Sequence, residues 1–194
     1  MQNRKSSGVF GKVLSAVAFA LLVFTVAANF AHAKSPIQSG FGEAEVEWRQ
    51  IVGILAPGLT VGSGAGKVTG GGAPWHTVAG NAEVNLTTGN IRFSVEGLVL
   101  ASGNSIGTSG PVTSVKGTLV CDTTGVLNGG NSTLVDTPVV PLSAQGNASF
   151  RGNLGVLPAA CTSQPNVAFL IRAGNAWIAS GMVRVSEAEG DDHR

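Results

Sequence analysis

The sequence predicts an all-β protein: a single-domain antiparallel β-sandwich, with a small β-barrel as the alternative, preceded by a helical signal peptide. Three observations carry this prediction. The chain beyond residue 33 is rich in Gly, Val, Thr, Ser and Asn and contains no Tyr. Short β-branched runs are separated throughout by Gly, Pro and Asn, which is typical of strands joined by tight turns. No helical periodicity is present outside the first 33 residues.

The first 33 residues have the pattern of a secretory signal peptide. Three basic residues precede an apolar run over 13–30, and the run ends in Ala-His-Ala at 31–33. This order predicts cleavage after Ala33, which makes Lys34 the new N-terminus. A retained anchor is the alternative, because 18 apolar residues approach the length that spans a bilayer. We expect a secreted or periplasmic protein with no stable membrane span after cleavage.

The rest of the chain is predicted to form one folded domain over 43–185. A flexible segment over 34–42 precedes it, and an acidic tail over 186–194, expected to be disordered, follows it. Export removes three basic residues, so nine Lys and Arg remain against 11 Asp and Glu, a formal charge of −2. This balance argues against a nucleic-acid partner, because phosphate binding relies on a clustered basic surface.

The clearest element is a hairpin over 82–95. Apolar and polar residues alternate on both sides of a Thr-Gly turn, so one face is apolar and the other is wet. We expect Val84 to face Phe93, which places Glu83 diagonal to Arg92.

A second hairpin is predicted over 167–183, with its turn at Gly174-Asn175. Its apolar residues fall on both faces, so it is expected to be buried on both sides at the centre of the fold. Arg172 is expected opposite Trp177, as a cation–π pair near the turn.

Further strands are predicted over 44–55, 59–63, 115–121, 134–142 and 148–154. Pro138 and Pro141 make the fourth of these an edge strand, because proline donates no hydrogen bond to a ladder. About eight to ten short strands in one domain favour the sandwich.

Cys121 and Cys161 are the only cysteines. Export to an oxidising compartment favours a disulfide between them, with two buried free thiols as the alternative. The bridge would close a loop of about 40 residues and stabilise the fold by about 4 kcal/mol through chain entropy.

The stretch TVGSGAGKVT over 60–69 looks like a phosphate-binding loop but does not meet its requirements. Such a loop needs Gly five residues before the Gly-Lys pair and Ser or Thr directly after it. Val61 and Val68 occupy these two positions. We therefore interpret residues 62–72 as a flexible loop and predict no nucleotide cofactor.

Catalytic and metal chemistry also lack their usual residues. His76 is the only histidine of the predicted domain, which leaves too few ligands for zinc or copper and no triad, although a calcium ion held by loop oxygens stays open. Glu83 and Glu96 both point outward from one hairpin and are candidates for a glycosidase pair, with solvated strand charges as the alternative. We expect no cofactor and no enzyme.

Trp48, Trp75 and Trp177 raise a binding hypothesis, because exposed indoles stack on sugars and peptides. Trp75 and His76 follow the Gly-rich loop and form the speculative ligand surface, with core filling as the alternative for each tryptophan.

Residues 80–86, the following Thr-Gly turn and residues 91–98 resemble the opening hairpin of CHRD domains, which are extracytoplasmic β domains. The resemblance covers under a fifth of the predicted mature chain. The histidine-rich segment expected next is replaced by ASGNSIGTSGPVTSV over 101–115, so no functional residue is carried over.

Together these observations predict an exported, non-catalytic protein that binds an unidentified extracytoplasmic ligand or protein, or contributes to the envelope. The alternatives are a secreted hydrolase acting on carbohydrate and a subunit of a surface assembly joined through an exposed edge strand.

Overall fold

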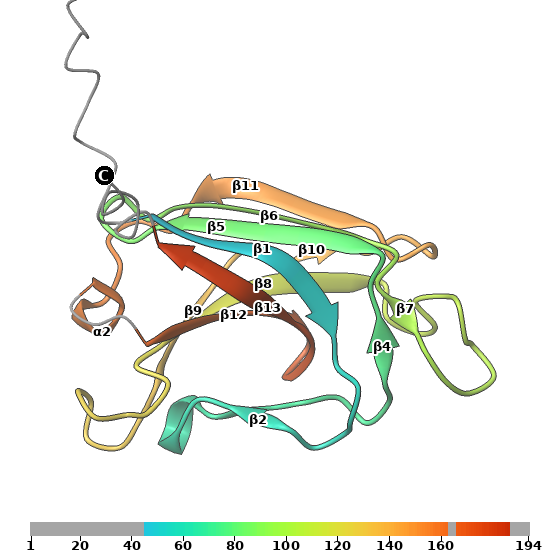
Figure 1. Ribbon diagram of the computed structural model, residues 1–194, viewed down its shortest axis with the longest axis horizontal. Coiled ribbons are helices and arrows are strands. Elements are labelled where there is room, and N and C mark those ends of the chain that lie inside the picture. Colours follow the sequence, from blue (N-terminus) through green and yellow to red (C-terminus); the bar gives the residue numbers. More distant parts are fainter. Residues whose placement is uncertain (1–44, 163–165, 187–194) are drawn as a thin grey trace, which may run out of the picture. The chain divides into compact units, whose positions relative to one another are not determined.

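The structure, a computed structural model, describes residues 45–162 and 166–186 and confirms the all-β class (Figure 1). The predicted signal peptide, the cleavage site at Ala33-Lys34, the segment over 34–42 and the tail beyond Ser186 lie outside the described residues. The strands are β1 (Glu45–Gly53), β2 (Thr60–Val61), β3 (Val68–Thr69), β4 (Trp75–His76), β5 (Ala79–Asn85), β6 (Asn90–Glu96), β7 (Val99–Leu100), β8 (Ser114–Cys121), β9 (Thr133–Asp136), β10 (Val140–Pro141), β11 (Ala148–Asn153), β12 (Val167–Ala173) and β13 (Ala176–Ser186). The helical turns are η1 (Gly64–Gly66) and α2 (Ala159–Thr162).

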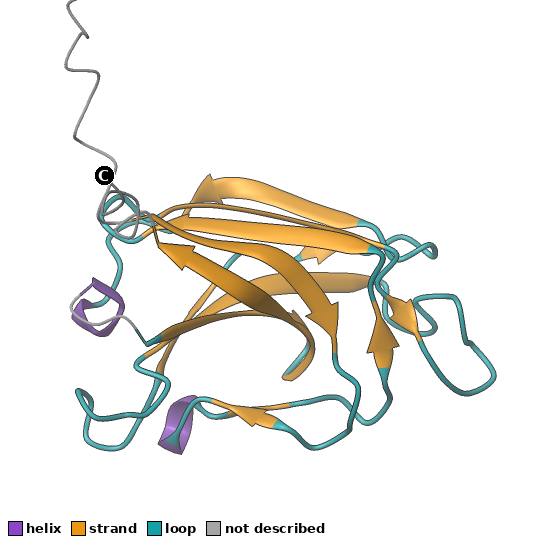
Figure 2. Ribbon diagram, viewed as in Figure 1, coloured by secondary structure: helices purple, strands orange, loops and turns teal. Residues whose placement is uncertain are grey.

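Nine of the described strands form one sheet that curls around the core (Figure 2). Its order is β10-β8-β12-β13-β1-β5-β6-β11, and β9 pairs with β8 on the same edge as β10. β10 and β11 stand at opposite ends of this order, yet a short turn over 142–147 connects them. In that turn the Ser143 N–H donates to the Asn147 carbonyl at 3.0 Å. The turn therefore holds the two ends of the curled sheet near each other.

Three aromatic rings show that the curl encloses a core. The ring centroid of Phe169 on β12 lies 5.6 Å from that of Trp48 on β1 and 5.7 Å from that of Phe93 on β6. β12 and β6 are separated by three strands in the sheet, so the contact crosses the interior. Gly117 on β8 makes room for it, because a Cβ there would lie 2.8 Å from the Phe169 ring and 3.0 Å from the Phe93 ring.

The hairpin of β5 and β6 has the predicted faces but not the predicted register. Val84 pairs with Ile91 rather than Phe93, and Glu83 lies directly opposite Arg92 instead of diagonal to it. The turn is longer than expected, because Asn85 organises it: its Oδ1 accepts the N–H groups of the two threonines that follow, at 3.1 and 2.8 Å. A shift of two residues leaves every side chain on its own face, so the apolar pattern still holds.

The hairpin of β12 and β13 is confirmed at the centre of the sheet. Ala173 pairs with Ala176 across the predicted turn, and Arg172 pairs with Trp177. β12 is buried on both faces, and the β2–β3 segment packs on this half of the sheet through Trp177, whose Nε1 donates to the Leu59 carbonyl at 3.1 Å.

The segment over 134–142 is an edge strand, as predicted, and is broken into β9 and β10. Thr137 stands at the break, and its Oγ1 accepts the Gly117 N–H at 2.9 Å, which replaces one bond of the ladder. The prolines at 138 and 141 fall at the break and at its far end, where no N–H is needed.

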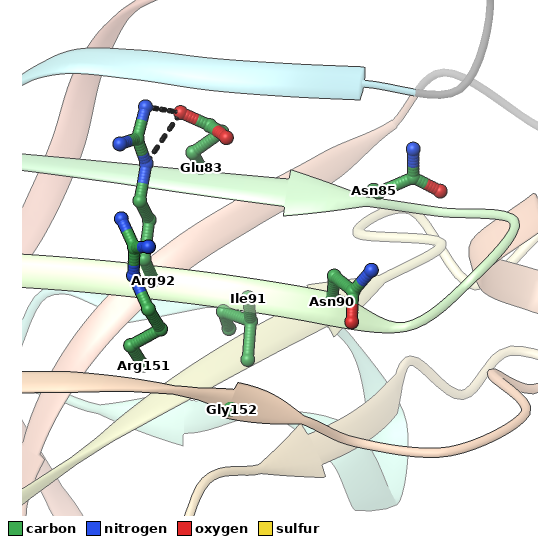
Figure 3. A pocket seen from close by; sticks show the side chains of 7 residues that line it. All are labelled: Glu83, Asn85, Asn90, Ile91, Arg92, Arg151 and Gly152. Carbon is green, nitrogen blue, oxygen red and sulfur yellow. Dashed lines mark hydrogen bonds and ion pairs between the residues drawn. The ribbon is translucent and has the colours of Figure 1, made fainter. Parts of the chain in front are cut away.

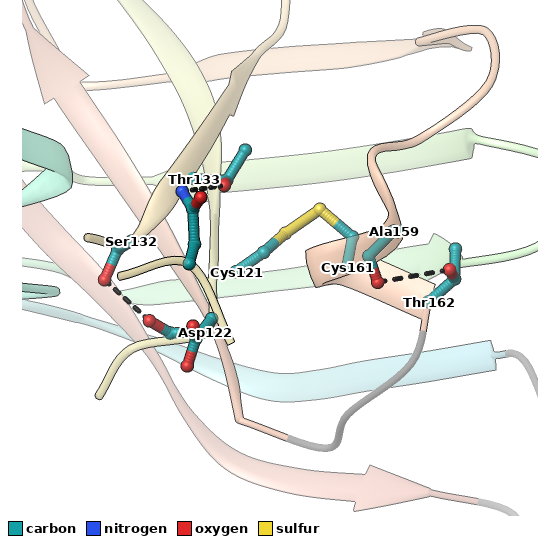
Figure 4. Close-up of a disulfide and its surroundings, with 8 residues drawn as sticks. Cys121, Asp122, Ser132, Thr133, Ala159, Cys161 and Thr162 are labelled. Carbon is teal, nitrogen blue, oxygen red and sulfur yellow. Dashed lines mark hydrogen bonds between the residues drawn. A yellow bond between two sulfur atoms is a disulfide. The ribbon is translucent and has the colours of Figure 1, made fainter. Parts of the chain in front are cut away.

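The predicted disulfide is present and joins Cys121 at the end of β8 to Cys161, with Cα atoms 4.8 Å apart (Figure 4). Cys161 lies in α2, a single helical turn that the sequence did not predict. The disulfide is compatible with an extracytoplasmic location. Within the described residues, no helix has the length and apolar character to cross a bilayer.

The segment that looks like a phosphate loop is hydrogen-bonded to the rest of the chain. The Ser63 N–H donates to Ser132 Oγ at 2.8 Å, and the Ala65 N–H donates to Asn131 Oδ1 at 2.8 Å. η1 leads into the strand β3 instead of a long helix. Amide groups that a phosphate would need are already used, and the expected flexible loop is instead tied to the loop after β8.

Candidate functional site

The predicted ligand surface at Trp75 and His76 is divided between core and surface. Trp75 is only 3% exposed and packs in the core, as do Trp48 and Trp177. Stacking of a ligand on Trp75 is therefore corrected to core filling. His76 is exposed on β4, where it pairs with Val99, and its side chain makes no hydrogen bond within the described residues.

A row of charged side chains crosses the outer face of the other half of the sheet. Glu47, Glu83, Arg92 and Arg151 lie opposite one another on β1, β5, β6 and β11. Arg92 donates to Glu83 Oε2 through Nε at 2.6 Å and also through Nη2. Figure 3 shows Arg151 reaching from β11 towards Arg92. Arg151 has no hydrogen bond or ion pair with any described residue, so this row contains one guanidinium that is paired and one that is available.

The charge of Glu83 is favoured by its surroundings. Partial burial raises its pKa, but a hydrogen bond with Glu45, the bond and charge of Arg92 and the charge of Arg151 lower it by more. The net pKa of Glu83 lies below its usual value. Glu83 is therefore ionised at neutral pH and neutralises Arg92.

Three shallow hollows follow one another along β6 and β11, with volumes of about 430, 400 and 580 Å³. Arg92 and Arg151 line both the first and the second, while Ser94 and Ser149 line both the second and the third. Neighbouring hollows share lining residues, so the three adjoin in one row on this face. We call this row the polar groove: the outer face of β6 and β11, from Asn90 and Gly152 at one end to Glu96 and Asn147 at the other.

Four asparagines of the polar groove are oriented by the fold. Each one accepts a hydrogen bond through its side-chain oxygen: Asn81 from the Ser94 hydroxyl at 2.7 Å, Asn85 from two backbone N–H groups, Asn90 from the Asn153 amide at 2.7 Å, and Asn147 from the Gly97 N–H at 3.0 Å. A backbone N–H can only donate, so the orientation of Asn85 and Asn147 follows from the network.

The same four asparagines leave their NH₂ groups without a partner among the described residues. Each NH₂ carries two N–H donors, and each of the four side chains lines one of the hollows. With Arg151, they give the polar groove several donors that no described residue uses. The arrangement can hold oxygen-rich groups of a ligand without any rearrangement of the sheet.

The carboxylates proposed as a glycosidase pair do not lie together. Glu83 is opposite Arg92, and Glu96 lies four residues further along β6, a distance of about 14 Å in a strand. Glycosidase carboxylates stand about 5 to 9.5 Å apart. Within the described residues, no group of three or more His, Cys, Asp or Glu is arranged to hold a metal ion.

Sequence reasoning missed Arg151 and the four asparagines as a group. Arg92 and Arg151 both occupy outward positions of predicted strands, and this alternation is the one signal present in the sequence. The two residues become neighbours only because β11 pairs with β6 across more than fifty residues of chain. The chain matches no protein-family model, no curated protein and no solved structure.

Proposed function

We propose that this chain is an exported, non-catalytic binding protein whose polar groove holds an extended polar ligand outside the cytoplasm. One observation carries the proposal: a row of adjoining hollows on one sheet face presents an unpaired guanidinium and four asparagine amide groups. The predicted signal peptide supports the location, and the disulfide is compatible with it.

The groove favours recognition over catalysis. Two carboxylates line it: Glu83 is ion-paired with Arg92, and Glu96 is about 14 Å further along the strand. Acid–base catalysis needs two such groups on either side of one bond. Binding needs only shape and complementary polar groups, both of which the polar groove supplies.

The test is a binding screen of the full chain against glycan and peptide arrays with two matched variants. Ser149→Trp fills the groove, because Ser149 lines two adjoining hollows. Ser102→Trp places the same indole on an exposed loop position outside the groove. We expect the wild type and Ser102→Trp to retain a common ligand that Ser149→Trp loses.

Equal binding by both variants would place the ligand elsewhere and contradict the proposal. Cleavage of a retained glycan, followed by mass spectrometry, would contradict its non-catalytic part. Fractionation of the producing cells and N-terminal sequencing test the location, with Lys34 as the expected first residue.

A further inference from the structure

The hydrogen-bonding character of the polar groove defines the chemistry of its ligand. The side-chain oxygens of Asn81, Asn85, Asn90 and Asn147 accept hydrogen bonds within the fold, and their NH₂ groups have no partner among the described residues. Each donor is satisfied only by an acceptor from solvent or from a ligand. The best-matched ligand is therefore rich in acceptor oxygens along its length.

The charges of the polar groove give it a direction. Arg151 stands near one end without an ion-pair partner in the described residues, whereas Arg92 beside it is held by Glu83. Glu96 stands at the opposite end, exposed. A guanidinium matches a planar carboxylate with two parallel hydrogen bonds, so an anionic group of the ligand belongs at Arg151. Glu96 repels a second anionic group at the other end.

The shape of the groove favours a linear polymer of sugars over a peptide or a stacked neutral sugar. Its floor is the paired strands β6 and β11, whose backbone groups facing each other are bonded within the sheet, so a peptide strand gains no ladder on the floor and would pair only along the other edge of β11. All three tryptophans of the chain are buried, which removes the indole platforms that neutral sugars use. Six paired residues per strand give a length of about 20 Å, enough for several sugar rings.

We propose that the polar groove binds a linear polysaccharide that carries carboxylates, with one carboxylate on Arg151 and the sugar hydroxyl and ring oxygens on the asparagine NH₂ groups. This inference rests on the proposed binding function and specifies its ligand. Uronic acid polymers in which acidic rings alternate with neutral ones match these features best: a linear chain, spaced carboxylates and oxygen acceptors throughout.

The experiment measures affinity of the full chain for three polyuronates of different linkage (polygalacturonate, alginate and hyaluronate) and for their methyl esters, which keep the sugar backbone but remove the charge. We expect at least one polyuronate to bind, its methyl ester to bind at least tenfold more weakly, and added NaCl to weaken the acid form alone. Arg151→Gln is expected to weaken binding of the acid form about tenfold, because it removes one solvent-exposed guanidinium–carboxylate pair.

Two further variants test the direction of the groove. Glu96→Gln is expected to strengthen binding of the acid form about twofold to threefold, because it removes an exposed like charge. Arg49→Gln is the matched control, since Arg49 is exposed on β1 and lines none of the three hollows. It is expected to bind like the wild type, with all variants showing the wild-type thermal midpoint.

Three outcomes overturn the inference. They are equal affinity for acid and ester, wild-type affinity in Arg151→Gln, and tighter binding of polyglutamate than of any polyuronate. If a neutral glycan or a peptide binds and Ser149→Trp abolishes that binding, the ligand class is wrong and the proposed function stands. If no polymer binds, and Ser149→Trp also keeps every ligand that the wild type retains on the glycan and peptide arrays, the ligand class and the proposed function are both wrong.

Discussion

Two ion-paired arginines lie on different halves of the curled sheet: Arg172 is buried, whereas Arg92 is half-exposed. On the half built from β8, β9 and β12, Arg172 is 7% exposed. It donates to Asp136 Oδ1 at 3.3 Å and to the Asn175 carbonyl at 3.4 Å. Asp136 also accepts from Lys116 at 2.5 Å and from Thr118 at 2.7 Å.

On the other half, Arg92 makes the same kind of pair with Glu83 but its side chain stays 48% exposed. Its neighbour Arg151 has no such pair among the described residues. The residue types are alike in the two places, so chemistry alone does not separate a structural arginine from an available one. The two places differ in what covers the arginine side chains. The β2–β3 segment packs on Trp177 beside Arg172, whereas the side chains of the polar groove face solvent.

The largest effect is expected from the disulfide, which ties the covered half together at the end of β8. The double variant Cys121→Ala with Cys161→Ala is expected to lose about 4 kcal/mol of unfolding free energy, because the unfolded chain regains the entropy of a loop of 40 residues. Urea unfolding followed by tryptophan fluorescence measures it. Reduced wild-type protein serves as the control and should lose a similar amount. A loss below about 1 kcal/mol would show that the packing alone holds this half.

Next in size is the matched pair Asp136→Asn and Glu83→Gln. The first leaves the buried guanidinium of Arg172 without its anion and is expected to cost about 2 kcal/mol of unfolding free energy. The second breaks an exposed pair and is expected to cost less than about 1 kcal/mol. Equal losses in urea unfolding would remove the distinction between the two halves.

The dependence of unfolding free energy on pH tests the same comparison between the two ion pairs. Burial raises the pKa of Asp136, but its hydrogen bonds from Lys116 and Thr118 and the charges of Lys116 and Arg172 lower it by more, so the net pKa lies below the usual value. A carboxylate with a lowered pKa stabilises the fold above its unfolded-state pKa, and this stability is lost as the pH falls through the folded-state value. Unfolding free energy is therefore expected to fall below about pH 4.

Asp136→Asn is expected to lessen this fall of the unfolding free energy at low pH, because the asparagine does not titrate. Glu83→Gln should have a smaller effect, since its partner Arg92 is half-exposed whereas Arg172, the partner of Asp136, is buried. Urea unfolding between pH 2.5 and 6 decides the matter, and an equal fall in the wild type and Asp136→Asn would contradict the expectation.

Local pattern was enough to predict much of the fold. Alternation located β5 and β6, the two prolines marked the edge at β10, and export chemistry predicted the Cys121–Cys161 bridge. The register of the β5–β6 hairpin was wrong by two residues, because the pattern repeats every two residues and cannot distinguish such a shift. The side chain of Asn85 decides it by lengthening the turn.

The candidate site was less accessible to sequence reasoning. Arg151 becomes a neighbour of Arg92 through pairing of strands distant in the chain, which no local pattern encodes. Trp75 was predicted to lie on a ligand surface because it is an aromatic residue after a Gly-rich loop, but it is buried in the core. The three tryptophans, which are rare in the sequence, lie in the core, whereas asparagines, which are common in it, line the polar groove.

The smallest effect is expected where the groove is available for a ligand. Arg151→Gln should change the unfolding free energy by less than about 0.5 kcal/mol, because Arg151 is exposed and bonds to no described residue. Arg172→Gln is the comparison and should lose well over 1 kcal/mol, since it removes a buried cation from Asp136. Urea unfolding at neutral pH measures both. If Arg151→Gln were as destabilising as Arg172→Gln, Arg151 would be a structural residue, and the groove would have no guanidinium to offer a ligand.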